Sequence, residues 1–270
     1  MAAASITARA VTPGTTARGG TPGTTARGGT PVGRPGTGTA AADFGRPATA
    51  STVVITTAGT YVGEVRENLR HGPGRLTFTN GDEYVGQFER GLRHGKGELM
   101  FDGGRRKYEG GWYRSLRQGD GHEWWPHGKK YVGQYARDRF DGSGILITVQ
   151  GKYEGQFKKG AKSGTGLMRW TSGDTYEGAW LDGKMHGVGR YRKGDGSGKV
   201  YDGQWVAHVR EGRGVETILH GDRYEGGWHD NAKHGLGHVR YTNGKVRDGR
   251  WRAGKHERWL GKERLMKGRR

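Results

Sequence analysis

Residues 176–189 read Tyr-Glu-Gly-Ala-Trp-Leu-Asp-Gly-Lys-Met-His-Gly-Val-Gly. If Tyr176 is position 0 of a repeat, glycine stands at positions 2, 11 and 13 and an aromatic ring at position 4. The position 0 tyrosine recurs every 22 to 25 residues, at Tyr61, Tyr84, Tyr108, Tyr131, Tyr153, Tyr176, Tyr201 and Tyr224. All eight copies have glycine at positions 2, 11, 13 and 20. A register shared eight times identifies a repeat array.

The composition fits a repeat array and excludes other classes of glycine-rich protein. Glycine supplies 55 of the 270 residues, and hydrophobic residues only 31%. Collagen needs glycine at every third position and abundant proline, whereas this chain has seven prolines. Nine tryptophans and twelve tyrosines are uncommon in a disordered chain. The absence of cysteine excludes disulfides, thiolate zinc sites and a cysteine nucleophile.

Alternation within each repeat predicts two strands, because successive side chains of a strand point to opposite faces. Positions 0, 2 and 4 share one face of the first strand, and positions 11, 13, 15 and 17 share one face of the second. Large rings are expected to lie over the bare glycines of the neighbouring strand. The expected packing residues of the repeat quoted above are Tyr176, Gly178, Trp180, Gly187 and Gly189, with Gly187 beneath a ring.

Turn residues separate the predicted strands. Position 7 is mostly Asn, Gly, Ser or Asp, and the second turn contains pairs such as Asn80-Gly81, which suit tight turns. Each repeat is therefore a hairpin, and a lone hairpin is not stable. The sequence predicts an all-β fold, an elongated single-layer antiparallel β-meander of eight hairpin repeats. At about 4.8 Å per strand it would be about 75 Å long.

The stretch from Tyr176 to Gly189 is similar to the consensus of the MORN (membrane occupation and recognition nexus) family. The resemblance covers residues 60–254. It is weakest in repeats three to five, where Gln118, Asp141 and Ser163 replace the histidine before Gly-x-Gly. The resemblance implies an elongated β-meander and a scaffolding role, often in cilia, at the cell cortex or at organelle junctions.

The chain divides into three parts. Residues 1–52 repeat the segment Thr-Pro-Gly-Thr-Thr-Ala-Arg-Gly-Gly and predict a low-complexity disordered tail that folding does not need. Arginines without acids before Asp43 also fit a cleaved mitochondrial transit peptide. Residues 53–254 are the array, with eight repeats plus a partial ninth. Residues 255–270 are expected to be a basic cap or a short helix that places Trp259 and Leu260 over the last hairpin.

The formal net charge of +19 favours acidic partners such as tubulin tails, anionic lipid or nucleic acid. Residues 247–270 hold ten Lys/Arg and three Asp/Glu. A solvated tail and a docking element both fit that charge. The expected contacts with an acidic partner are Arg258, Lys262, Arg264 and Lys267.

No catalytic, cofactor or metal site is predicted. The segment 155–163 resembles a phosphate loop, but an alanine interrupts it and the strand-to-helix setting is absent. His71 and His94 share position 10 in adjacent repeats, yet no thiol or nearby carboxylate completes a metal site. No Ser-His-Asp set can be selected. The protein is therefore expected not to be an enzyme and to have no small-molecule substrate.

An apolar patch interrupts the polar pattern of the second face. Its members are Trp124, Val132, Ile145, Ile147 and Leu167. Such a patch on a single-layer sheet needs a cover. The cover is the chain's own tail, a second copy in a homodimer, or a partner helix. The alternative is ordinary β-branched strand composition without a partner.

These observations favour a non-enzymatic scaffold that binds protein partners within a multi-subunit assembly. The preferred setting is a structural role in a cytoskeletal or axonemal (ciliary) assembly of the cytoplasm. One alternative is a peripheral membrane adaptor that binds anionic lipids through its basic charge. The other is a subunit of a large organellar (mitochondrial) assembly.

Overall fold

The structure is a computed structural model that describes residues 8–10 and 52–265. Twenty strands form one sheet, and sixteen of them, β3 to β18, make the eight hairpin repeats. The hairpin strands are β3 Gly59–Arg66, β4 Leu69–Phe78, β5 Glu83–Glu89, β6 Leu92–Phe101, β7 Arg106–Tyr113, β8 Leu116–Trp124, β9 Lys130–Ala136, β10 Arg139–Thr148, β11 Gly151–Lys158, β12 Ala161–Trp170, β13 Thr175–Leu181, β14 Lys184–Arg192, β15 Val200–Val206, β16 Val209–Thr217, β17 Arg223–His229 and β18 Ala232–Arg240.

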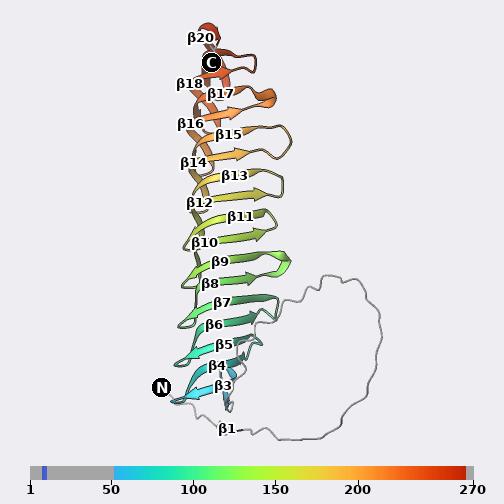
Figure 1. Cartoon of the computed structure of the whole chain (residues 1–270), viewed down its shortest axis with the longest axis vertical. Coiled ribbons are helices and arrows are strands. Elements are labelled where there is room, and N and C mark those ends of the chain that lie inside the picture. Colours follow the sequence, from blue (N-terminus) through green and yellow to red (C-terminus); the bar gives the residue numbers. More distant parts are fainter. Residues whose placement is uncertain (1–7, 11–51, 266–270) are drawn as a thin grey trace, which may run out of the picture.

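The sheet is an antiparallel meander whose strands lie across its long axis (Figure 1). Each strand pairs with the next in sequence, so β3 and β18 lie far apart. Two single-turn 3-10 segments, η1 Pro126–Gly128 and η2 Leu219–Gly221, fill second turns. The predicted all-β meander of hairpin repeats is confirmed. Within residues 8–10 and 52–265, no helix is long and apolar enough to cross a membrane.

The first turn of each repeat is a two-residue turn with both residues in the left-handed region. Glu67 and Asn68, for example, have φ of 50° and 59°. Turns of this type match the twist of the strands they join. Positions 6 and 7 repeat this geometry throughout the array, so all first turns lie along one side of the sheet.

A β-bulge interrupts every hairpin near the Gly-x-Gly. In repeat six, Gly178 pairs with Gly189, but Trp180 already pairs with Met185. Gly187 lies inside this bulge with φ of 63°, and a Cβ there would point toward Ala179 at 3.2 Å. The expectation that Gly187 lies beneath a ring is therefore wrong. Strand alternation predicts side-chain direction only where the ladder is regular.

Four strands extend the array beyond the eight hairpins. At one end, β2 Thr52–Thr56 pairs with β3, and the short β1 Ala8–Ala10 pairs with β2. The rest of the tail 1–52 lies outside the described residues. At the other end, β19 Lys245–Arg252 and β20 Lys255–Leu265 form a ninth hairpin. The short-helix alternative for residues 255–270 is wrong over β20, because Ala253 and Gly254 repeat the first-turn geometry.

Candidate functional site

One face of the sheet carries a continuous spine of aromatic rings, and we call it the ring face. Each position 0 tyrosine meets the position 4 ring of the following repeat edge to face, with centroids 4.9 to 5.4 Å apart. From Tyr84 onward, each also meets the position 4 ring of its own repeat. The spine comprises Tyr61, Tyr84, Phe88, Tyr108, Trp112, Tyr131, Tyr135, Tyr153, Phe157, Tyr176, Trp180, Tyr201, Trp205, Tyr224, Trp228 and Trp251.

The position 0 tyrosines are buried but fully hydrogen-bonded. Their exposed fraction is at most 2%. Each hydroxyl donates a hydrogen bond of 2.8 to 3.0 Å to the position 3 carbonyl of its own repeat, within the bulge. Burial raises the pKa of Tyr153 and Tyr176 to about 12. The hydroxyl thus fixes the bulge, and the ring fixes the spine.

Glycines make room for each ring. A Cβ on Gly189 would collide with the Tyr176 ring, and a Cβ on Gly178 would collide with the backbone of Gly189. The same contacts recur at positions 2 and 13 of all eight repeats. Tyr176, Gly178, Trp180 and Gly189 therefore lie in one packing layer, whereas Gly187 does not.

Position 9 carries a second ladder beside the spine, which the alternation pattern did not reveal. Six of the eight repeats have Arg or Lys there, half-buried, with the charge over spine rings. The Arg93 guanidinium lies 4.3 Å from the Trp112 ring centroid. Phe140 takes this place in repeat four and stacks on Tyr131 at 3.7 Å. These cations strengthen the links between neighbouring repeats.

Repeat three contains a buried carboxylate where other repeats have mostly apolar residues at position 15. Glu123 is 1% exposed and accepts hydrogen bonds from Arg106, Arg117 and the Tyr135 hydroxyl. Burial alone would lower the pKa of the Arg117 guanidinium, but Glu123 and Asp138 raise it above its usual value. This network is a structural ion cluster, because Glu123 pairs with two arginines and no buried polar side-chain atom of the described residues lacks a hydrogen-bond partner.

The opposite face of the sheet, which we call the open face, brings the five predicted interface residues together. Val132 pairs with Ile145, and Leu167 follows two strands further on. Trp124 and Ile147 flank Lys130 in the adjacent row. Val132 is 41% and Ile147 40% exposed.

Val132, Ile145 and Leu167 line an open groove of about 850 Å³. Its floor is glycine backbone, and Glu154 and Glu177 lie among the apolar side chains. Apolar side chains mixed with carboxylates suit a protein segment better than a small molecule, because the groove does not enclose its contents.

Sequence reasoning missed a second groove of about 860 Å³ near the C-terminal end of the array. Val215, Leu236 and Leu260 supply its apolar surface, and Glu225 and Asp248 its carboxylates. Leu236 is 65% exposed. The apolar residues within a single repeat do not indicate this groove. Only the register of five adjacent strands brings Val215, Glu225, Asp248 and Leu260 into one row, with Leu236 beside it.

The remaining candidate residues lie apart from both ladders. Arg258 and Lys262 are exposed on β20. The side chain of Arg264 and all of Lys267 lie outside the described part of the chain. The position 10 histidine His94 pairs with Glu89 at 3.1 Å. Between residues 52 and 265, no cluster of three or more His, Asp or Glu side chains could hold a metal ion.

Comparison with known families gives a clear result. The model of the MORN repeat matches seven segments that together span more than half of the chain, namely 61–83, 84–105, 131–151, 153–175, 176–198, 201–218 and 224–246. The chain belongs to the MORN repeat family. Curated protein sequences give no match.

The family model of the MORN repeat does not match repeat three, where Pro126 departs from the other repeats. Repeat three nevertheless has the same geometry as its neighbours, because the Tyr108 hydroxyl donates to Gly111 and Gly121 lies against the Tyr108 ring. The array therefore contains eight MORN repeats by structure.

Among solved structures, the MORN array is similar to the TCP domain of SAS-4 (dCPAP) from Drosophila melanogaster, solved in complex with a proline-rich motif of Ana2 (dSTIL). The identity is 13% and the TM-score 0.34, over 56% of this chain and 81% of that chain. MORN repeats make this chain a repeat scaffold that serves protein interaction.

Proposed function

We propose that this MORN protein is a structural component of a cytoskeletal assembly, axonemal in particular, in which the open face holds partner proteins. The observation that carries the proposal is the apolar patch on the face opposite the spine, in which Trp124 and Ile147 lie in the row beside a groove. Val132, Ile145 and Leu167 line that groove. No described side chain from elsewhere in the chain lines it. An exposed apolar groove on a sheet is the expected form of a protein interface.

The shape of the array supports a structural role. Each spine ring links its repeat to the next, so the sheet from Tyr61 to Trp251 is one continuous body. Such a body presents sites at fixed separations along its length. The two grooves lie at repeats four to six and seven to nine, so the sheet offers two positions for partner segments.

The test compares full-length protein with the double variant Trp124→Ser and Ile147→Lys, expressed in ciliated cells and followed by proximity labelling. The wild type should label axonemal proteins. The double variant should remain folded by circular dichroism, because neither residue belongs to the spine, and should lose that labelling. The loss corresponds to about 2 kcal/mol or more if Trp124 is an anchor. Thr217→Lys, at the same position as Ile147 but in repeat seven, is the matched control.

Three outcomes would contradict the proposal. Unchanged labelling by the double variant would place the interface elsewhere. Wild-type labelling confined to mitochondrial proteins, with a shortened N-terminus, would support the organellar alternative. Labelling confined to membrane proteins, together with salt-sensitive vesicle binding, would support the lipid adaptor.

A further inference from the structure

The first turns of successive repeats form one rigid margin, which we call the turn edge and define as positions 5 to 8 of each repeat. In eight places the position 7 N–H donates to the position 9 carbonyl of the preceding repeat, at 2.8 to 3.1 Å. Arginine side chains add further links, such as Arg93 to the Ser115 carbonyl at 3.0 Å. The tips of neighbouring repeats are therefore held at a fixed separation.

Four consecutive tips of this edge carry a cation. Position 6 has φ of 46° to 51° in every first turn, a conformation that favours Asn, Asp or Gly. Repeats two to five instead have basic residues there, namely Arg90, Arg114, Arg137 and Lys159. The backbone gives no reason for that choice. Strained positions that carry an unexpected side chain are candidates for function.

The tip cations are exposed and have no carboxylate partner. Among the described residues, no ion pair involves any of the four side chains. The acids nearby have other partners, since Glu89 pairs with His94 and Asp138 pairs with Arg117. Asp141 accepts a hydrogen bond of 3.0 Å from the backbone N–H of Lys159, not from its side chain. Arg139 and Lys158 add two more exposed cations to the same edge.

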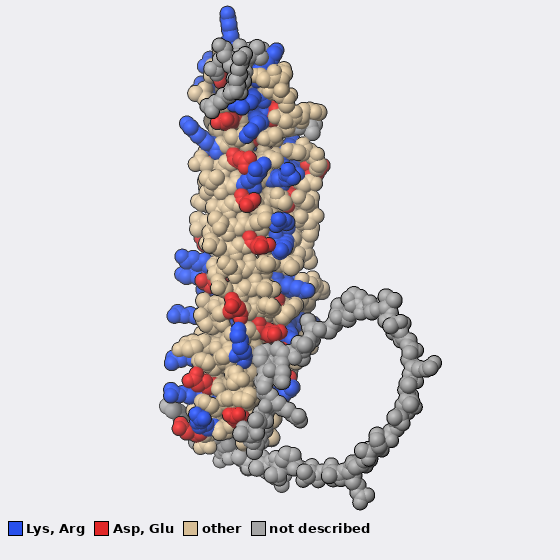
Figure 2. All heavy atoms as spheres, in the orientation of Figure 1, with Lys and Arg blue, Asp and Glu red and all other residues tan. Residues whose placement is uncertain are grey.

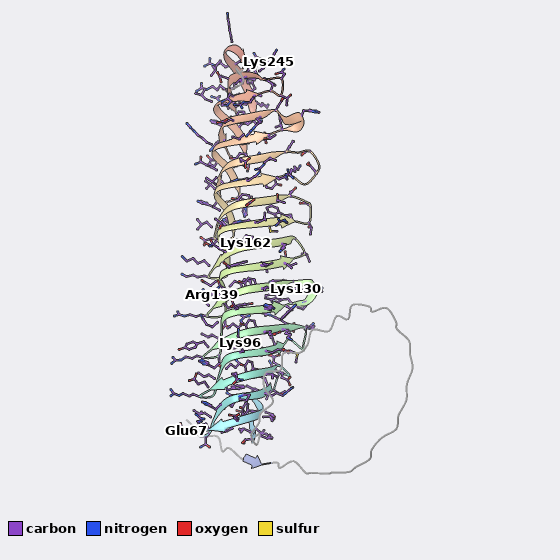
Figure 3. All side chains as sticks on the ribbon, viewed as in Figure 1. Glu67, Lys96, Lys130, Arg139, Lys162 and Lys245 are labelled. Atoms are coloured by element: carbon purple, nitrogen blue, oxygen red, sulfur yellow. The ribbon has the colours of Figure 1, made fainter. Side chains whose placement is uncertain are left out.

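The turn edge is distinct from both grooves. Lys and Arg side chains project along the margin where the first turns lie (Figure 2). Glu67 and Arg139 lie at this margin, while Lys130 lies on the other side of the sheet, near a second turn (Figure 3). A ligand on this edge would therefore leave the open face free.

We propose that the turn edge of repeats two to five binds an extended acidic peptide. Adjacent tips are two strands apart, or about 10 Å, so four cations span about 30 Å. A polyproline II segment advances about 9.3 Å in three residues and returns to the same face. Acidic side chains at every third position of a segment of about ten residues thus meet one cation per repeat.

The row suits a linear ligand of limited length better than a membrane. It is a single file of cations, and both of its ends carry an acid, Glu67 before Arg90 and Asp182 after Lys159. Those two carboxylates repel an acidic ligand that extends further. A bilayer surface has no such limit of length, and a broad basic patch binds it better than a single row of cations does.

The experiment measures binding of two fluorescent peptides of equal composition to the full chain by anisotropy. In one peptide, (Glu-Ala-Pro)₄, the acids recur at every third residue. In the other, the same four glutamates are contiguous. The periodic peptide should bind several-fold more tightly, and its binding should weaken with salt.

The variant with Arg90, Arg114, Arg137 and Lys159 all changed to Asn removes the row without harming the fold, because Asn suits the tip conformation. It should bind the periodic peptide at least about tenfold more weakly, because four exposed ion pairs of modest strength each would together supply that much affinity. The matched control changes Lys130, Lys152, Arg169 and Arg192 to Gln, which removes the same charge from the open face. It should keep affinity within about threefold.

Equal binding of the two peptides, or equal losses in the two variants, would overturn the proposal in favour of non-specific charge attraction. Binding of phosphatidylserine vesicles without binding of either peptide would overturn it in favour of a membrane. Because the open-face variant Trp124→Ser with Ile147→Lys leaves the turn edge intact, its result does not bear on this proposal.

Discussion

The indole Nε1 of Trp180 donates a hydrogen bond of 3.1 Å to the carbonyl of Gly166 in the preceding repeat. The same ring meets Tyr153 and Tyr176, each at 5.2 Å. Three other position 4 tryptophans donate to position 13 glycines in the same way. The bond is thus a repeated link between neighbours, and it ties the spine to the backbone.

Trp180→Leu should lower the free energy of unfolding by about 3 kcal/mol, because it removes that hydrogen bond and the ring contacts with Tyr153, Tyr176 and His208. Since repeats are coupled mainly to their neighbours, the two halves should then unfold in separate transitions. Denaturant unfolding followed by circular dichroism tests this. Trp170→Leu, with one tilted ring contact at 6.1 Å, is the control and should cost less.

The two glycines of Gly187-Val-Gly189 should respond differently to substitution. Gly187→Asn should change the melting temperature little, because Asn accepts a φ of 63° and only Ala179 lies near. Gly189→Ala should destabilise the protein by about 2 kcal/mol or more, because the new methyl collides with the Tyr176 ring. Equal melting temperatures for the two variants would refute this assignment of roles.

Glu123→Ala should lower stability by about 3 kcal/mol, because it leaves Arg106 and Arg117 without their buried carboxylate. Glu216→Ala removes a carboxylate at the same position of repeat seven, where it pairs with Arg210 and Lys233. Glu216 is 17% exposed, so its loss should cost less. Denaturant titration of both variants provides the comparison, and an equal cost would contradict it.

The spine should lose its stability at alkaline pH. In the unfolded chain tyrosines lose their protons near pH 10, whereas burial raises the pKa of Tyr61, Tyr201 and Tyr224 to about 12. Between those values the unfolded state binds fewer protons, so the contribution of these tyrosines to stability is constant below about pH 10 and is lost as the pH rises toward 12. Tyrosinate absorbance and circular dichroism should change together. If the spine tyrosines ionise at pH 10 while the protein is still folded, this prediction is wrong.

Much of the fold could be predicted because the repeat period, and the spacing of residues within a repeat, can be read directly from the positions of individual residues. Tyr176, Gly178 and Trp180 occupy fixed positions, and their alternation gave the hairpin, the ring face and the open face. The role of Gly187 could not be predicted, because a bulge breaks alternation without changing the spacing of the glycines. β20 was missed as a strand because its Gly-x-Gly is absent, although Ala253-Gly254 repeats the turn.

The candidate site was predictable in part. Val132, Ile145 and Leu167 stood out as apolar residues at polar positions, and the register places them in one groove. The position 9 cations were missed, because Arg93 looks like a surface residue until its guanidinium is seen over Trp112. Leu236 was missed since Val215 and Leu260, the other apolar residues of its groove, belong to other repeats.

Because the strands of this sheet lie across its long axis, tension between its two ends acts along the inter-strand hydrogen bonds and peels them apart one after another. A terminal hairpin has only one neighbour, so it opens before any interior hairpin. Each opening releases about 23 residues, or roughly 80 Å of chain. Stretched from its ends, the protein would lengthen in equal steps and recover each step when the load falls.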